Sequence, residues 1–403
     1  MSLLLRNALL LDPAAGDYTE GDLRCEDGRI VETGSGLHAA GDTRVVDVAG
    51  APVVPGLIDA HVHVTALSAD LAALGSLSPS YVTAHSARIM GQMLDRGFTT
   101  VRDASGADHG LADAQAEGLI RGPRVLFCGK GLSQTGGHGD LRGRGVNQRD
   151  DHPCCAGVGR VADGVEAVRV AARDELRKGA HHIKVMASGG VASPTDRIDS
   201  TQYSMDELRA VVEEARAANR YVAAHAYTAR AVNRALEAGV RTIEHGNLLD
   251  DSSVELFLRH DAFLVPTLVT YWALKEEGMA FGLPEPSWRK VDEVLDAGLR
   301  ALERAARGGV RLAYGSDLLG GMHRHQNQEF RLRREVQQPI DVLRAATTNA
   351  AELAGLAGEI GTLAVGARAD LLVLDGDPLE DIGVLAEPRR IRHVVQGGEV
   401  VTG

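Results

Sequence analysis

Cysteine is scarce in this sequence, and the few residues present lack the spacing of a disulfide framework or a zinc site. The 403 residues include four cysteines, Cys25, Cys128, Cys154 and Cys155, and no C-x-x-C pair. We therefore expect free thiols in a reducing compartment. Cys154 and Cys155 are adjacent in a polar segment and are the only cysteines for which a redox role comes into question.

Long apolar runs are also absent. No stretch reaches the roughly 18 apolar residues that a membrane-spanning helix needs. The apolar segment near the N-terminus is interrupted by Arg6 and Asp12, has no basic residues before it and is followed by no small-residue cleavage site. This pattern argues against a signal peptide. We expect a cytoplasmic protein with no membrane partner.

Positive charge is in deficit. Lysine and arginine number 43 against 55 aspartates and glutamates, which gives a net charge of −12. A nucleic-acid partner needs clustered cations to neutralise phosphates, so this balance argues against one. The apolar fraction of 44% and the charged fraction of 24% are ordinary for a globular protein.

Both ends of the sequence have the pattern of β-strands. Residues 1–54 hold short apolar runs separated by turns, with a hairpin signal at Asp27-Gly28 and a candidate pair of strands within residues 3–12. Residues 359–403 are similar and carry a tight-turn signal at Gly397-Gly398. The simplest interpretation is one small β domain built from both termini, with a larger domain inserted between them.

The middle of the chain, residues 55–358, alternates strand-like apolar runs with helical runs. Eight such units can be counted, and helices near residues 327–337 and 340–354 close the set. The helix starting near residue 205 opens with a capping box, Ser204-x-x-Glu207. Strands that alternate with helices predict a parallel sheet. Eight units at this length predict an α/β protein of the (β/α)₈ TIM-barrel type.

Residues able to bind metal lie at the ends of five predicted strands. Strand one ends in PGLIDAHVHV, where two histidines alternate and therefore point to the same face. Taken singly, each residue has an ordinary explanation, such as a core histidine or a helix N-cap aspartate. Because barrel chemistry takes place at the C-terminal strand ends, we expect one site formed by all six: His61, His63, Lys184, His225, His245 and Asp317.

This motif set resembles that of the amidohydrolase superfamily of metal-dependent hydrolases over nearly the whole chain, including a split β-sandwich beside the barrel. The resemblance implies a binuclear site, usually zinc. His61, His63 and Asp317 would bind the more buried metal, and His225 and His245 the more exposed one. Lys184, carbamylated by CO₂, would bridge both metals.

The residue types suit that chemistry. Neutral imidazole and carboxylate oxygen are zinc ligands, and a lysine among cations is driven towards the neutral amine that reacts with CO₂. A hydroxide bridging two metals exists at neutral pH because metal binding lowers the pKa of water. It would attack the amide carbon, while Asp317 takes its proton and passes it to the leaving nitrogen.

Within the superfamily, several segments are similar to the prolidase-like and Xaa-Arg carboxypeptidase-like dipeptidases. These segments are IKVMASGG, TGGHGD and AHAYT. Deaminase-like and imidazolonepropionase-like members generally use one metal and lack the bridging lysine. The resemblance implies that His138 and Tyr227 hold the substrate's C-terminal carboxylate or carbonyl.

Selectivity is less well defined by the sequence. A pocket for C-terminal arginine or lysine would need an acidic residue, and Glu276, Glu277, Asp196 and Asp199 are candidates. Tyr271 and Trp272, in the expected loop after strand seven, could instead form an apolar wall. We expect a neutral or apolar C-terminal residue such as proline.

Three functions remain open. The first is a zinc dipeptidase or N-acyl amino acid amidase acting on a small molecule. The second is a hydrolase of a non-peptide amide, urea, carbamate or cyclic amide in the same fold. The third is a metal-free scaffold, which the presence of all six ligand positions disfavours. A homo-oligomer is compatible with each of these functions.

Overall fold

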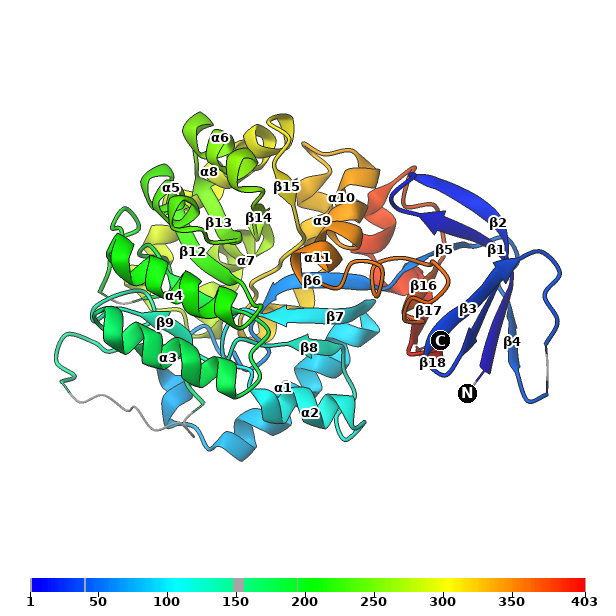
Figure 1. Cartoon of the computed structure of the whole chain (residues 1–403), viewed down its shortest axis with the longest axis horizontal. Coiled ribbons are helices and arrows are strands. Elements are labelled where there is room, and N and C mark those ends of the chain that lie inside the picture. The colour runs from blue at the N-terminus through cyan, green and yellow to red at the C-terminus, as the bar shows by residue number, and fades with distance from the viewer. Residues whose placement is uncertain (1, 40, 148–155, 194, 403) are drawn as a thin grey trace.

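A computed structural model describes residues 2–39, 41–147, 156–193 and 195–402. Figure 1 shows a sheet carrying both ends of the chain beside a larger part in which helices surround parallel strands. Cys25 and Cys128 are buried free thiols, whereas Cys154 and Cys155 lie outside the described residues. No helix in the described ranges is both long and apolar enough to cross a membrane.

The sheet formed by the two termini has eight strands. Its order is β18-β17-β16-β5-β1-β2-β3, with β4 paired to β1. The predicted turns at Asp27-Gly28 and Gly397-Gly398 join β2 to β3 and β17 to β18. These strands are β1 (Ser2–Asp12), β2 (Asp17–Glu26), β3 (Arg29–Gly34), β4 (Arg44–Asp47), β5 (Pro52–Pro55), β16 (Leu371–Leu374), β17 (Ile391–Gln396) and β18 (Glu399–Thr402).

The remaining strands form two parallel sheets. One has the order β6-β7-β8, and the other has the order β10-β9-β11-β12-β13-β14-β15. Their bounds are β6 (Leu57–Val62), β7 (Phe98–Asp103), β8 (Arg124–Leu126), β9 (Gly131–Ser133), β10 (Gly159–Val161), β11 (Ile183–Met186), β12 (Val222–Thr228), β13 (Thr242–Leu248), β14 (Phe263–Val265) and β15 (Arg311–Leu312).

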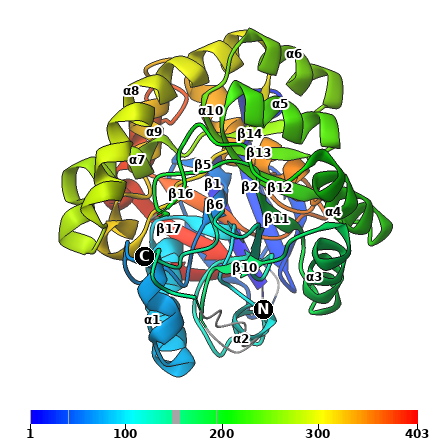
Figure 2. The ribbon, with the colours of Figure 1, turned by 90° about the vertical axis from the view of Figure 1, so that its left-hand side faces the viewer.

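Helices alternate with the parallel strands and lie around them (Figure 2). The capping box predicted at Ser204 and Glu207 opens α4. The helices are α1 (Pro79–Asp95), α2 (His109–Ala116), α3 (Val165–Arg177), α4 (Met205–Ala217), α5 (Ala229–Ala238), α6 (Asp251–His260), α7 (Leu268–Glu277), α8 (Glu285–Arg307), α9 (Gln328–Arg333), α10 (Pro339–Ala345) and α11 (Thr348–Leu353). Short 3₁₀ turns are η1 (Leu71–Ser76), η2 (Gly278–Phe281), η3 (Gly320–His325), η4 (Ile382–Ala386) and η5 (Pro388–Arg390).

Backbone hydrogen bonds connect the edges of the two parallel sheets. Ala60 N donates to Tyr314 O at 2.8 Å, and Asp317 N donates to His61 O at 2.8 Å. At the other edge of the three-stranded sheet, His181 N, just before β11, donates to Phe127 O, just after β8, at 2.8 Å. The first pair of bonds brings the end of β6 against the segment that follows β15, so His61 and Asp317 lie side by side.

Three local expectations were wrong. Residues 3–12 form one strand, because Asn7, at a φ of 55°, absorbs a register shift inside β1 where a turn was expected. The segment after β14 is the helix α7, since the run from Leu268 to Glu277 contains no glycine or proline to break it. The helix expected at 340–354 is divided into α10 and α11.

Candidate metal centre

Two histidines at the end of β6 meet the aspartate that follows β15. The Nε2 atoms of His61 and His63 lie 3.3 Å and 3.1 Å from Asp317 Oδ1. His61 is buried, and His63 faces a cavity. The alternation predicted from the H-x-H sequence therefore brings both rings to one carboxylate.

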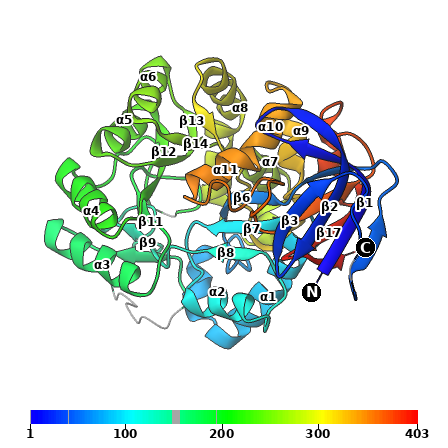
Figure 3. The same ribbon diagram turned by 45° about the vertical axis from the view of Figure 1, so that its right-hand side comes forward.

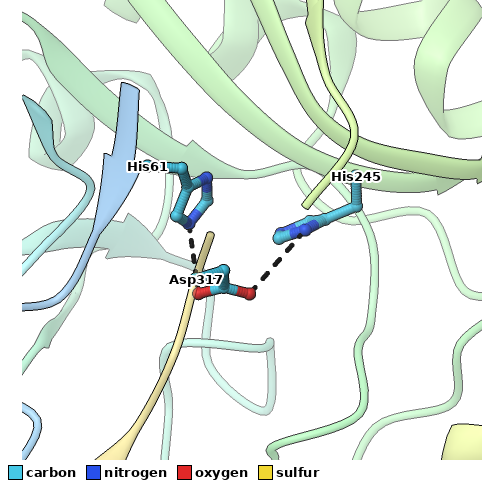
Figure 4. A group of neighbouring side chains, drawn as sticks. All are labelled: His61, His245 and Asp317. Atoms are coloured by element: carbon cyan, nitrogen blue, oxygen red, sulfur yellow. Dashed lines mark ion pairs between the residues drawn. The ribbon is translucent and has the colours of Figure 1, made fainter. Parts of the chain in front are cut away.

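A third imidazole, on β13, completes a compact group. Ligand atoms of His61, His245 and Asp317 all lie within 4.8 Å of one another. Figure 4 shows the Asp317 carboxylate between the two rings, with His245 Nδ1 3.8 Å from Asp317 Oδ2. This group mixes residues that the resemblance assigns to two different metals, which is what a closely spaced pair of metal sites would produce.

The backbone is unusual at these positions. His245, Thr267 and Asp317 have positive φ values of 75°, 46° and 53°. Residues other than glycine rarely adopt positive φ values. The resulting backbone strain costs about 1–3 kcal/mol per residue, and strained residues cluster at functional sites. In β13 the kink at His245 breaks strand alternation, so the consecutive residues Glu244 and His245 both approach His61.

Lys184 lies on β11 and lines the same cavity, with its side chain almost fully buried. Burial lowers the pKa of its ammonium, although the Glu244 and Asp317 carboxylates oppose this effect. Among the described residues we find no hydrogen bond or ion pair to the Lys184 amine. A buried amine without a fixed partner is suited to conversion into a carbamate.

His225, on β12, lies beside the compact group but is turned slightly away from it. Its ring centroid is 4.6 Å from that of His245, and its Nε2 donates to Gly189 O at 3.1 Å. Burial, with help from the neighbouring His138, His245 and Lys184, holds its pKa well below the usual range. The ring is therefore neutral, with a lone pair on Nδ1.

The hydrogen bonds of these rings provide a test of whether the residues fit a metal. His61 Nδ1 donates to Glu244 Oε2 at 2.7 Å, and His63 Nδ1 donates to Ser105 O at 2.9 Å. In the neutral form that binds metal, each ring carries a lone pair on Nε2 that faces the Asp317 carboxylate, so acceptors face acceptors. A cation between them satisfies all three atoms, and the nitrogen and oxygen donors suit zinc.

The two predicted substrate contacts form part of the cavity wall. His138 stacks on His225 with ring centroids 4.1 Å apart. Its Nδ1 lies 2.8 Å from Ser193 Oγ and 3.5 Å from Asp196 Oδ2. Tyr227 is buried at the end of β12, and its hydroxyl accepts a hydrogen bond from Tyr271 at 3.0 Å.

Glu244 and Arg102 are site residues that the strand-end interpretation missed. Both are almost completely buried, and Arg102 Nη2 lies 2.7 Å and 2.8 Å from the two Glu244 oxygens. The available signal was a charged residue inside each of two apolar strands, FTTVRD and TIEHGN. A buried charge needs a partner of opposite charge, so an arginine and a glutamate inside two apolar strands predict an ion pair between those strands.

The rest of the cavity wall is mainly apolar. Of the four acidic candidates, none lines the cavity within the described residues. Asp199 pairs with Arg197 and Glu277 with Arg324, Glu276 is exposed, and Asp196 is bound to His138. Apolar wall residues are Leu71, Met186, Val191, Leu274 and Leu319.

Other expectations about the wall were partly wrong. Tyr271 lines the cavity from helix α7, whereas Trp272 is more than a third exposed and packs on His325 instead. His323, in the short turn η3 that follows Asp317, is buried, and its Nε2 donates to Ala66 O at 3.2 Å.

Comparisons with known proteins agree with this geometry. A model of the amidohydrolase family matches residues 53–401. Ochratoxinase from Aspergillus niger is 34% identical over 367 residues, which cover 87% of this chain and 76% of the relative. A prolidase crystallised with N-methylphosphonate-L-proline is 50% identical with a TM-score of 0.97, covering 100% of this chain and 99% of that one.

A third relative is more distant, but the similarity extends over its whole length and over the whole of this chain. A Xaa-Pro dipeptidase with methionine bound in its active site is 26% identical, with a TM-score of 0.89 and 100% coverage of both chains. The family is generally metal-dependent, and the His61, His245 and Asp317 group is a candidate metal site. The chain therefore belongs to the amidohydrolase family and is a hydrolase acting on carbon–nitrogen amide bonds.

Proposed function

We propose that this protein cleaves the amide bond of dipeptides or N-acyl amino acids with a neutral or apolar C-terminal residue. One observation supports this most strongly: metal-ligand residues from five strand ends line one cavity together with His138 and Tyr227. The similar prolidase, with its bound proline phosphonate, supports proline as one leaving group.

The proposal includes a specific architecture. Residues 55–358 would form a (β/α)₈ barrel, and residues 1–54 and 359–403 a flanking β-sandwich domain. The backbone bonds from Ala60 to Tyr314 and from His181 to Phe127 support closure of the barrel, because they connect both edges of the three-stranded sheet to the seven-stranded one. In such a barrel the strand ends that carry the site share one face.

Two divalent metals, with zinc as the expected ion, would occupy this face. His61, His63 and Asp317 would hold one metal, and His225 and His245 would hold the other. A carbamate on Lys184 would bind both metals. Bound metals would lower the pKa of a water molecule and polarise the substrate carbonyl. The neutral His225 and His245 rings support this assignment, because burial holds the pKa of each well below its usual range.

The chain's own residues would carry the proton and orient the substrate. The Asp317 carboxylate faces His61, His63 and His245, and beside a bound cation it would be ionised. It would accept the proton of the attacking water and pass it to the leaving nitrogen. His138 and Tyr227 would bind the C-terminal carboxylate, and the apolar wall would accommodate the side chain.

Amino-acid release from a panel of dipeptides and N-acyl amino acids tests the proposal, using protein reconstituted with zinc and bicarbonate. We expect release of proline or an apolar C-terminal residue. Release of arginine or lysine would retain the dipeptidase class and reject the apolar pocket. No release, with two metals bound, would reject the proposed substrate class.

The alternative is hydrolysis of a non-peptide amide, urea, carbamate or cyclic amide. The 34% identity to ochratoxinase, whose name indicates action on ochratoxin, specifically favours a non-peptide amide. An aryl amide that lacks a C-terminal carboxylate, added to the panel, distinguishes the two functions, because an enzyme that binds the carboxylate would prefer the dipeptides and N-acyl amino acids.

Asp196 offers a sharper test of carboxylate binding. It is buried, lies 3.5 Å from His138 Nδ1 and 3.6 Å from Lys290 Nζ, and leaves His138 Nε2 free for substrate. We expect Asp196→Asn to raise KM about tenfold with little change in kcat, since a hydrogen bond to a charged group contributes about 1.5–3 kcal/mol.

The control for this test is Asp199→Asn, on the same loop but exposed and paired only with Arg197. A substrate whose C-terminal carboxylate is replaced by an amide should show the same KM with both variants. Equal KM values for the wild type and Asp196→Asn on the carboxylate substrate would show that Asp196 does not contribute to substrate binding.

A further inference from the structure

Glu244 is the most enclosed charged group next to the metal centre. Its carboxylate has no solvent exposure and makes contacts on three sides. Oε2 accepts the Nδ1–H of His61 at 2.7 Å, both oxygens face Arg102 Nη2, and Oε1 accepts the Thr242 hydroxyl. Every direction from which this carboxylate could be approached is therefore occupied by a donor.

This arrangement fixes the tautomer of His61. Both Glu244 oxygens accept from the Arg102 guanidinium, which is always charged, and Oε1 also accepts from the Thr242 hydroxyl, so Glu244 faces His61 as an acceptor. A neutral imidazole in this position must therefore carry its proton on Nδ1. The lone pair is then on Nε2, which faces Asp317 at 3.3 Å.

Arg102 holds both the carboxylate and the strand that carries the histidine. Its Nε donates to Ala60 O at 2.5 Å, one residue before His61, and its Nη1 donates to the Thr242 hydroxyl at 3.1 Å. Without a cation, a carboxylate this deeply buried would be costly to keep charged. Arg102 therefore positions His61 in two ways. It bonds the backbone carbonyl of the preceding residue, Ala60, and it holds the Glu244 carboxylate that bonds the His61 ring.

We propose that Glu244 is a positioning residue of the metal centre, held by Arg102, and that its function is to present His61 Nε2 as a ligand. The inference rests on the metal site of the proposed function, but it is independent of which amide is the substrate. Groups that hydrogen-bond a liganding histidine typically change metal affinity or activity by about 10–100-fold when removed.

Glu244→Gln tests this with little change in shape. If the amide NH₂ faces Arg102, two donors oppose each other. If it faces His61, it donates to Nδ1 and moves the ring proton to Nε2, which removes the ligand lone pair. Either orientation harms the site, and the second disables His61 directly.

The matched control is Glu329→Gln. Glu329 and Arg333 are also completely buried, and Glu329 accepts hydrogen bonds from Arg333 Nε at 2.8 Å and from Val269 N at 2.7 Å. The amide creates the same donor conflict there, without a metal-ligand histidine. The control therefore measures the cost of disturbing a buried ion pair in this chain.

The measurement is zinc affinity by chelator competition in the absence of substrate, together with the visible absorption spectrum of the cobalt-loaded protein. We expect Glu244→Gln to lose about 10–100-fold in affinity and to change the cobalt spectrum. Glu329→Gln should match the wild type in both. Thr242→Val is a milder variant for the case that Glu244→Gln does not fold. It removes one hydrogen bond to Glu244, and we expect it to fold and to weaken metal binding to a smaller degree.

Wild-type affinity and spectrum in Glu244→Gln would overturn the proposal, as would an equal loss in Glu329→Gln. If Glu244→Gln does not fold, wild-type affinity in Thr242→Val would overturn it too. A wild-type protein that binds no metal would also reject it. A wild-type protein that binds metal but cleaves no amide in the panel would reject the proposed function and leave this inference intact.

Discussion

Replacing Asp317 with asparagine should lower kcat/KM by about 10³-fold, the middle of the range for loss of a positioned proton carrier. The carboxylate lies within 3.3 Å of two imidazoles, and its ionised form is the one that can accept a proton. Asparagine keeps the shape but neither accepts that proton nor balances the charge of a cation. The measurement is kcat/KM with metal content determined on the same sample.

A control separates this effect from a structural one. Asp250 is also an aspartate in a strand-to-helix connection, where it caps α6 by accepting from Ser253 N. Asparagine caps helices as well as aspartate does, so Asp250→Asn should keep wild-type kcat/KM. If Asp317→Asn retained more than about a tenth of the activity with full metal content, its proposed proton transfer would be wrong.

Lys184→Met should also have a severe effect. We expect the variant to lose one bound metal and its activity to fall by about 10³-fold or more. Methionine matches the length and burial of the side chain but cannot form a carbamate. Wild-type protein stripped of metal should regain activity faster with zinc plus bicarbonate than with zinc alone. Metal content by atomic emission and the bicarbonate dependence of reactivation are the two measurements.

Lys178→Met is the control for this second change. That lysine pairs with Asp174 and Glu175 at the end of α3 and does not line the metal cavity. It should leave metal content and bicarbonate dependence unchanged. Two metals in Lys184→Met, or reactivation indifferent to bicarbonate, would contradict a carbamate at this position.

The sequence predicted which residues line the candidate metal centre better than it predicted their surroundings. His61, His63, Lys184 and Asp317 could be found because each ends an apolar run, and parallel strands bring their ends to one face. Glu244 could not be assigned in the same way. Its partner Arg102 is on another strand far away in the sequence, and only the kink at His245 brings two consecutive side chains to the same histidine.

The fold was predictable where local patterns are strong. Most helices and strands lie where the periodicity placed them, and both glycine turns of the terminal sheet are present. The helix α7 was missed because its buried, mainly apolar residues lack a clear polar face, so Tyr271 was assigned to a loop. Buried helices of this kind cannot be separated from apolar loops or strands by periodicity alone.

The shared terminal sheet has a consequence for how the protein is made. Strand β5 pairs with β1 on one side and with β16 on the other, and its buried Val53 lies opposite Val373. Figure 3 shows the blue N-terminal strands of this sheet beside the red C-terminal strand β17. A ribosome releases β5 early and β16 only after the whole α/β region between them has been translated. Until then β5 has an unpaired apolar edge, which is open to association with other chains. We expect newly made protein to depend on chaperones until its last strands arrive.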